Sequence, residues 1–170
     1  VLIPAIMLAL FGCATLLFDF LVPHQRRFLL VIALAGLAFT GYGLWQQQAY
    51  LSSTGFAELS AFNGVVTIDG FALFFNWMFL LAALIMVLVS YKYLEVEGEH
   101  HGEYYALVLF AQCGMFFLAA GTDLVTLFVG LELMALCFYI MVGFLRGEKR
   151  SNEAAMKYLL LGAFSSGFLV

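Results

Sequence analysis

Charged residues are scarce in this chain of 170 residues: they make up 11% of it, against 65% apolar residues. An ordinary soluble domain carries about 25% charged and about 45–50% apolar residues. So few charges cannot cover a soluble fold, and so many apolar side chains cannot be hidden inside one, which excludes a soluble enzyme and a disordered segment. Only 7 Lys and Arg residues and a net charge of −4 exclude a nucleic-acid binder. The composition predicts an all-α polytopic membrane protein.

Cysteine is also rare, and Cys13, Cys113 and Cys137 all lie inside apolar runs. No Cys-x-x-Cys spacing accompanies them, so iron–sulfur, zinc and disulfide frameworks are not expected. The chain also lacks a glycine-rich phosphate loop after a strand and a recognisable site for a flavin or nicotinamide. We therefore expect no cofactor in this chain, and any redox chemistry has to take place in another chain.

Long apolar runs dominate the sequence instead. A transmembrane helix needs about 17–25 predominantly apolar residues, and six runs are long enough. They cover residues 1–22, 28–45, 71–90, 104–120, 124–145 and 152–170. The last run is still apolar at Val170, so we expect the N-terminal piece of a longer subunit, folded as one transmembrane domain over 1–170.

Basic residues fall in alternate loops. Six of the 7 lie in the first, third and fifth loops, namely Arg26, Arg27, Lys92, Arg146, Lys149 and Arg150. The positive-inside rule assigns these loops to the cytoplasm. The N-terminus is then expected on the opposite side, which is the periplasm in a bacterium.

The longest connection, residues 46–69, is expected on the outer surface. It contains the pair Asn63-Gly64, followed by the β-branched run 65–68. Asn-Gly before β-branched residues is typical of a tight turn leading into a strand. This loop is therefore predicted to hold a short strand or hairpin.

Smaller residues mark helix ends and helix contacts. Asp123 and Ser151 precede the fifth and sixth runs and are the expected N-caps of those helices. Asp19, near the inner end of the first run, is expected at the interface and has no assigned role. Small residues in the second and sixth runs are predicted to let helices approach closely; they are Gly36, Gly41, Gly43, Gly162, Ser165, Ser166 and Gly167.

One acidic residue does not fit the apolar runs: Glu132, the ninth residue of the run 124–145. At 1.5 Å per residue it lies about 12 Å from the outer end of that run and about 20 Å from the inner end. An ionised side chain near the bilayer middle costs about 2.5–3.5 kcal/mol on insertion scales. The same helix face carries no opposite charge, so compensation has to come from another helix, from water or from protonation of the carboxyl. Glu132 is a candidate proton relay; the alternative is a permanently protonated or ion-paired packing residue.

One basic residue lies inside the sixth run: Lys157, about 9 Å from the inner end at 1.5 Å per residue. Glu153 stands four residues earlier, in the favourable order for an ion pair along a helix. The functional interpretation is that Lys157 takes and gives up a proton in a hydrated bundle interior, with Glu153 modulating it, because burial readily favours a neutral lysine. The alternative is an anchored lysine whose stem reaches the membrane surface.

The residues around these charges form a recognisable pattern. A mid-membrane Glu is followed by a basic loop and by a helix that opens with Ser-x-Glu-Ala-x-x-Lys-Tyr; the matching segments are 130–133, 143–144, 146–150 and 151–158. The stretch 65–75, with Asp69-Gly70-Phe71-Ala72, also matches. From about Asp69 to its end, the chain resembles the antiporter-like subunits of respiratory complex I, and among these subunit N.

This resemblance implies a bundle of about fourteen helices with inverted-topology repeats, of which this chain is the N-terminal part. In that family Glu132 would belong to a charged axis along the membrane middle and pair with a lysine on a later, broken helix. Lys157 would be the other charged position of the region.

The resemblance also implies a function: a non-redox, proton-translocating membrane-arm subunit of NADH–quinone oxidoreductase in the bacterial inner membrane. Quinone reduction elsewhere in the complex would drive proton transfer through Glu132, Lys157 and Glu153. The expected partners are other membrane subunits of the complex and the lipid bilayer, not nucleic acid, with quinone only indirectly involved. The alternatives are a subunit of an Mrp-type sodium/proton antiporter and a structural scaffold subunit of the same kind of complex.

Overall fold

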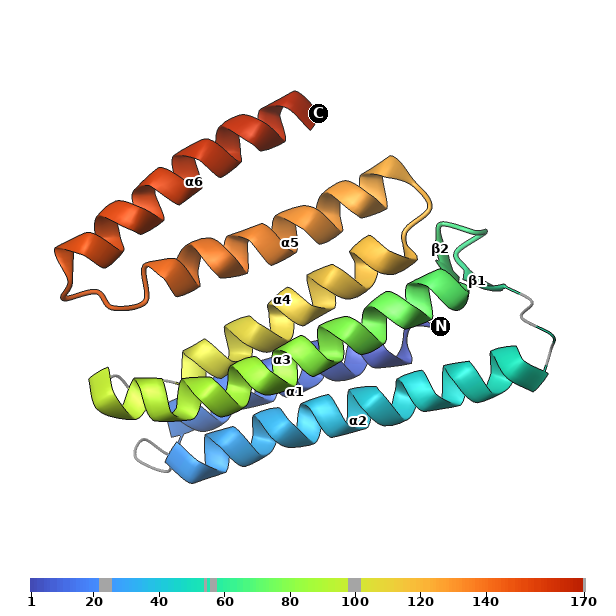
Figure 1. Cartoon of the computed structure of the whole chain (residues 1–170), viewed down its shortest axis with the longest axis horizontal. Helices are drawn as coiled ribbons and strands as arrows, with labels where there is room; N and C mark the ends of the chain where they lie inside the picture. The colour runs from blue at the N-terminus through green and yellow to red at the C-terminus, as the bar shows by residue number, and fades with distance from the viewer. Residues whose placement is uncertain (22–25, 54, 56–57, 98–101, 170) are drawn as a thin grey trace.

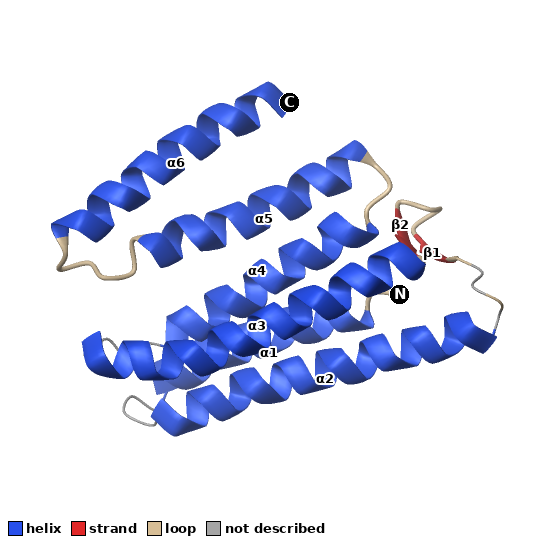
Figure 2. Ribbon diagram, in the orientation of Figure 1, coloured by secondary structure: helices blue, strands red, loops and turns tan. Residues whose placement is uncertain are grey.

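The computed structural model describes residues 1–21, 26–53, 55, 58–97 and 102–169. The chain folds into long helices, with one short two-stranded sheet between the second and third (Figures 1 and 2). The helices are α1 (Ile3–Leu21), α2 (Arg26–Ser53), α3 (Gly70–Glu97), α4 (Gly102–Ala120), α5 (Leu124–Val142) and α6 (Lys149–Leu169). The strands are β1 (Leu59–Ala61) and β2 (Val66–Ile68). The predicted all-helical architecture is therefore confirmed.

Five of these helices, α1 to α5, are long and apolar enough to cross a membrane. This fits a multi-pass membrane protein. Helix α6 has 21 residues but is not among the five; all of its charged residues lie in its first nine positions. Whether α6 is the sixth membrane span stays a prediction.

The helices α1 to α4 form a bundle, and α5 and α6 extend it in one direction. Helix α4 lies at its centre, where it packs against α1, α2, α3 and α5, and its Leu109 and Phe116 are buried. Helix α6 lies at the edge of the assembly and packs mainly against α5 (Figure 1). The buried residues of the core accordingly belong mostly to α1 to α4.

Several helix ends differ from the expected positions. Helix α2 continues through the glutamine run to Ser53, eight residues past the expected end of the apolar run. Its polar end is held by contacts: Gln47 Nε2 donates to the Val1 carbonyl at 2.6 Å, and Trp77 Nε1 of α3 donates to Gln48 Oε1 at 3.1 Å. A helix needs internal hydrogen bonds and not apolar side chains, so the apolar run is shorter than the helix that contains it.

The two expected N-caps do not act as such. Asp123 occupies the N-cap position of α5, but its side chain makes no capping hydrogen bond. Helix α6 begins at Lys149, so Ser151 lies inside it, and its Oγ donates to the Val142 carbonyl at 2.7 Å. Ser151 thus ties the start of α6 to the end of α5 instead of capping its own helix.

Asp19 has a clear structural role that the sequence did not indicate. Its Oδ2 accepts a hydrogen bond from the Gly102 backbone N–H at 2.8 Å. Gly102 is the first residue of α4, where backbone N–H groups lack partners within the helix. The carboxylate of α1 therefore caps α4 across 83 positions of sequence.

The two strands form an antiparallel hairpin in which Leu59 pairs with Ile68 and Ala61 with Val66. The turn between them contains Phe62 and Asn63 at φ 52° and 56° and Gly64 at φ 90°. Such positive φ values favour Asn and Gly, which is the signal that the sequence carries here.

The hairpin is attached to the connection between α4 and α5. The Thr122 N–H donates to the Val65 carbonyl at 3.1 Å, and Thr122 Oγ1 reaches the Gly64 carbonyl at 2.5 Å. A β-bridge joins Val66 to Gly121. The hairpin therefore holds the end of α4 next to the start of α5, the helix that carries Glu132.

Replacing Thr122 by valine is expected to weaken this attachment, because the isosteric side chain leaves the Gly64 carbonyl without its hydroxyl partner. One lost hydrogen bond of this kind costs about 1 kcal/mol. Thermal unfolding of the full-length subunit should show a lower Tm, whereas Thr122→Ser should retain the wild-type value. If Thr122→Val and Thr122→Ser have the same Tm, the hydroxyl does not contribute to this attachment.

Candidate functional site

Helix α5 is placed by a very close approach to α4. A Cβ atom on Gly114 would lie 2.7 Å from the Gly130 carbonyl oxygen, and one on Gly130 would lie 2.9 Å from the Gly114 carbonyl oxygen. Glycine at both positions lets the two backbones touch, as small residues do at helix contacts in membranes. Since Gly130 is two residues before Glu132, this contact fixes the height of Glu132 relative to the bundle.

Glu132 is half-buried, and its hydrogen-bond partner comes from α6: Ser166 Oγ donates to Glu132 Oε1. From the sequence, the charge of Glu132 was expected to be compensated by another helix, by water or by protonation of the carboxyl. Ser166 was predicted only to let helices approach closely. In the structure Ser166 also supplies the hydrogen-bond donor of Glu132. A hydroxyl donor reduces the cost of a carboxylate in an apolar environment without adding a charge.

The interface between α5 and α6 is otherwise made by aromatic and small residues. Tyr139 of α5 packs edge-on against Tyr158 of α6, with ring centroids 4.7 Å apart. The Tyr139 hydroxyl lies directly over Gly162, where a Cβ atom would be only 1.7 Å from it. Tyr139 is seven residues after Glu132 on α5, so both side chains lie on the helix face that meets α6.

Lys157 and Glu153 form the expected ion pair, with Lys157 Nζ 2.6 Å from Glu153 Oε1. Both side chains are exposed in this chain, at 70% and 66%. Lys157 is nine residues before Ser166, about 14 Å along the helix at 1.5 Å per residue. The structure therefore brings Lys157 and Glu153 together and places Glu132 apart from them, with Ser166.

The loop between α5 and α6 is anchored on the start of α4. Arg146 lies 3.5 Å from the carboxylate of Glu103, and Phe144 packs edge-on against Tyr104 with ring centroids 5.1 Å apart. The Arg146–Glu103 pair is exposed, so it adds little to stability. Together with the Tyr104–Phe144 contact, it places the basic loop beside the start of α4.

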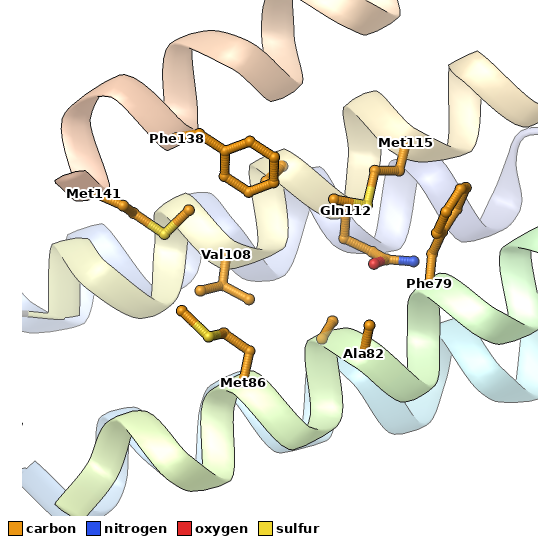
Figure 3. Close-up of a pocket in the computed structure, with 10 residues that line it drawn as sticks. Phe79, Ala82, Met86, Val108, Gln112, Met115, Phe138 and Met141 are labelled. Carbon is orange, nitrogen blue, oxygen red and sulfur yellow. The ribbon is translucent and has the colours of Figure 1, made fainter. Parts of the chain in front are cut away.

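The cavity between α3, α4 and α5 is separate from Glu132 and almost entirely apolar, with a volume of about 230 Å³ (Figure 3). Its one amide, Gln112, is already engaged: with its nitrogen toward the Phe79 carbonyl, the amide donates at 2.8 Å and its oxygen accepts from Leu80 N–H at 3.2 Å. Among the residues that the structure describes, no group of three His, Cys, Asp or Glu side chains could hold a metal ion.

Comparison with known proteins shows which sequences this chain is similar to. The chain is 71% identical to NADH-quinone oxidoreductase subunit N 2 of Solibacter usitatus, over 99% of this chain and 35% of that protein. It resembles subunit N. Subunit N 1 of Koribacter versatilis is 48% identical over 97% of this chain and 33% of its own length. The chain thus spans about a third of the length of the subunit N relatives that it matches.

Two further comparisons point to the same kind of complex. A family described as "NADH:quinone oxidoreductase/Mrp antiporter, TM" matches residues 121–170, which include Glu132, Glu153 and Lys157. The structure superimposes on a chain of respiratory complex I from Thermus thermophilus with bound aureothin, with a TM-score of 0.74 and 30% identity, over 97% of this chain and 34% of that one. The resemblance expected from the motif around Glu132 is confirmed. It extends before Asp69, where the sequence had shown only a common layout of spans.

Proposed function

We propose that this chain forms part of a proton-translocating membrane-arm subunit of an NADH-quinone oxidoreductase of the complex I type. The observation that carries the proposal is the half-buried Glu132, partnered by Ser166 in a chain that resembles subunit N. A carboxyl in that place can hold a proton or a charge. Quinone reduction elsewhere in the complex would change the surroundings of Glu132 and so move a proton.

In this proposal Lys157 and Glu153 form a second proton-transfer position on the cytoplasmic side of Glu132. Their ion pair is exposed in this chain and would be covered by later helices of the full-length subunit. In general, a carboxylate partner favours the charged form of a lysine, and an apolar environment without that partner favours the neutral form. A lysine that loses and regains its carboxylate partner can therefore release and take up a proton.

The similarity to subunit N also supports a proposal for the full-length protein. We infer that α6 is a sixth span and that the full-length subunit is a bundle of about fourteen helices with inverted repeats. It would lie in the bacterial inner membrane, with its N-terminus in the periplasm and the loop 46–69 on the same side. Its partners would be other membrane subunits of the complex and lipid. The subunit itself would carry no cofactor and perform no redox step, and it would depend on quinone only indirectly.

The proposal is tested with the full-length subunit in its assembled complex, reconstituted in vesicles. NADH should drive proton uptake into the vesicles, and an inhibitor of the quinone site should stop proton uptake and quinone reduction together. The alternative, an Mrp-type antiporter subunit, requires proton movement that responds to a sodium gradient without NADH. Sodium-driven exchange that ignores the quinone-site inhibitor would overturn the proposal in favour of that alternative.

Lys157→Ala tests the second position. Proton uptake per quinone reduced is expected to fall severalfold, because the proposed carrier next to Glu153 is gone while the redox site is untouched. Lys149→Ala is a matched control, since it removes a lysine at the first residue of the same helix and should leave the ratio unchanged. Equal ratios in the two variants would show that Lys157 only anchors the helix end.

A further inference from the structure

We infer that Ser166 is a positioning residue that supplies Glu132 with a hydrogen-bond partner in both of its protonation states. The inference rests on the proposed function, in which Glu132 gains and loses a proton. It is carried by the contacts of a single hydroxyl group on α6.

Ser166 Oγ lies within hydrogen-bonding distance of two acceptors. One is Glu132 Oε1, and the other is the Gly162 carbonyl on its own helix, at 3.0 Å. A serine hydroxyl has one proton to donate and lone pairs with which to accept. It can therefore donate to only one of these two oxygens at a time, and the choice depends on whether Glu132 carries a proton.

When Glu132 is ionised, the Ser166 hydroxyl donates to the carboxylate. When Glu132 has taken up a proton from its donor, the carboxyl O–H donates to Ser166 Oγ, and the serine proton turns to the Gly162 carbonyl. Ser166 keeps its own proton throughout, so the exchange requires only a rotation of the hydroxyl. Both states of Glu132 are then paired.

Pairing in both states matters because Glu132 lies inside the membrane-spanning part of the chain. A buried polar group without a partner is costly, and a partner for only one state would hold Glu132 in that state. The neighbouring packing supports the same geometry, since Gly162 leaves room for the Tyr139 hydroxyl and keeps α6 against α5. Ser166 thus leaves neither state of Glu132 without a hydrogen-bond partner.

Three variants of the full-length subunit in the assembled complex test this role. Ser166→Ala removes the hydroxyl, Ser166→Thr keeps it, and Ser165→Ala is the matched control, because Ser165 is the adjacent, exposed serine. The readout is the infrared band of the protonated Glu132 carboxyl, identified as the band that disappears in Glu132→Gln. Proton uptake in vesicles is measured alongside.

The expected result is a shift of that band to higher frequency in Ser166→Ala, as for a carboxyl with one hydrogen bond fewer, with a severalfold loss of proton uptake. Ser166→Thr should restore both, and Ser165→Ala should change neither. A band that stays in place in Ser166→Ala would overturn the inference, even if Glu132→Gln stops proton uptake and so supports the proposed function. If Glu132→Gln leaves proton uptake intact, the proposed function fails, while the position of the band still decides whether Ser166 binds the carboxyl.

Discussion

Glutamine at position 132 is expected to reduce coupled proton transport and quinone reduction to a small fraction of their wild-type rates, in a complex that still assembles. The glutamine side chain has the same shape as the glutamate, and its amide oxygen can accept the Ser166 hydroxyl just as the carboxylate does. Packing against α6 is therefore kept, and only the ability to carry a proton or a charge is lost. The measurement follows NADH-driven quinone reduction and the pH difference across vesicles together.

The control for this variant is Glu148→Gln, which neutralises an exposed glutamate in the loop between α5 and α6. Both rates should remain at wild-type values there. If Glu132→Gln behaves like Glu148→Gln, then the half-buried carboxyl is a packing residue and the subunit is a structural scaffold, the third hypothesis raised by the sequence. A loss of assembly in Glu132→Gln would instead contradict the conclusion that the amide preserves the contact with Ser166.

Much of the fold could be predicted from the sequence because membrane helices are specified locally. Each long apolar run of the sequence corresponds to a helix, and the Asn63-Gly64 turn appears with the positive φ values that its residues favour. The ion pair of Lys157 with Glu153 was predictable for the same reason, since residues four apart on a helix are neighbours. Local rules determine these features, and the sequence displays them directly.

The contacts that complete the site are not local, and this is why they were missed. Ser166 and Glu132 are 34 positions apart, and Asp19 caps Gly102 across 83 positions. No periodicity links such pairs, because the register of one helix against another depends on how their small residues fit together. A charge in an apolar run identified Glu132, but nothing in the sequence distinguished Ser166 from Ser165, its neighbour.

Gly114→Ala is expected to destabilise the contact between α4 and α5. The added Cβ would lie 2.7 Å from both the Gly130 carbonyl oxygen and the Met134 backbone nitrogen. Neither is the end of a flexible side chain, so relief requires the two helices to move apart. Overpacking of this kind typically costs about 1–3 kcal/mol. Thermal unfolding should show a clear fall in Tm, or the subunit should fail to assemble.

The same separation should also reach the candidate site, because α5 carries Glu132 and is held from its other side by α6. Moving α5 off α4 changes the position of Glu132 relative to the bundle, so we expect proton uptake to fall in any Gly114→Ala complex that assembles. Gly147→Ala is the matched control, since no atom lies within 4 Å of the added Cβ in that exposed loop. If Gly114→Ala and Gly147→Ala melt at the same temperature and pump at the same rate, the close contact between α4 and α5 does not position Glu132. If Gly114→Ala alone loses both stability and pumping, the glycine pair sets the place of the proposed proton carrier as well as the packing of the bundle.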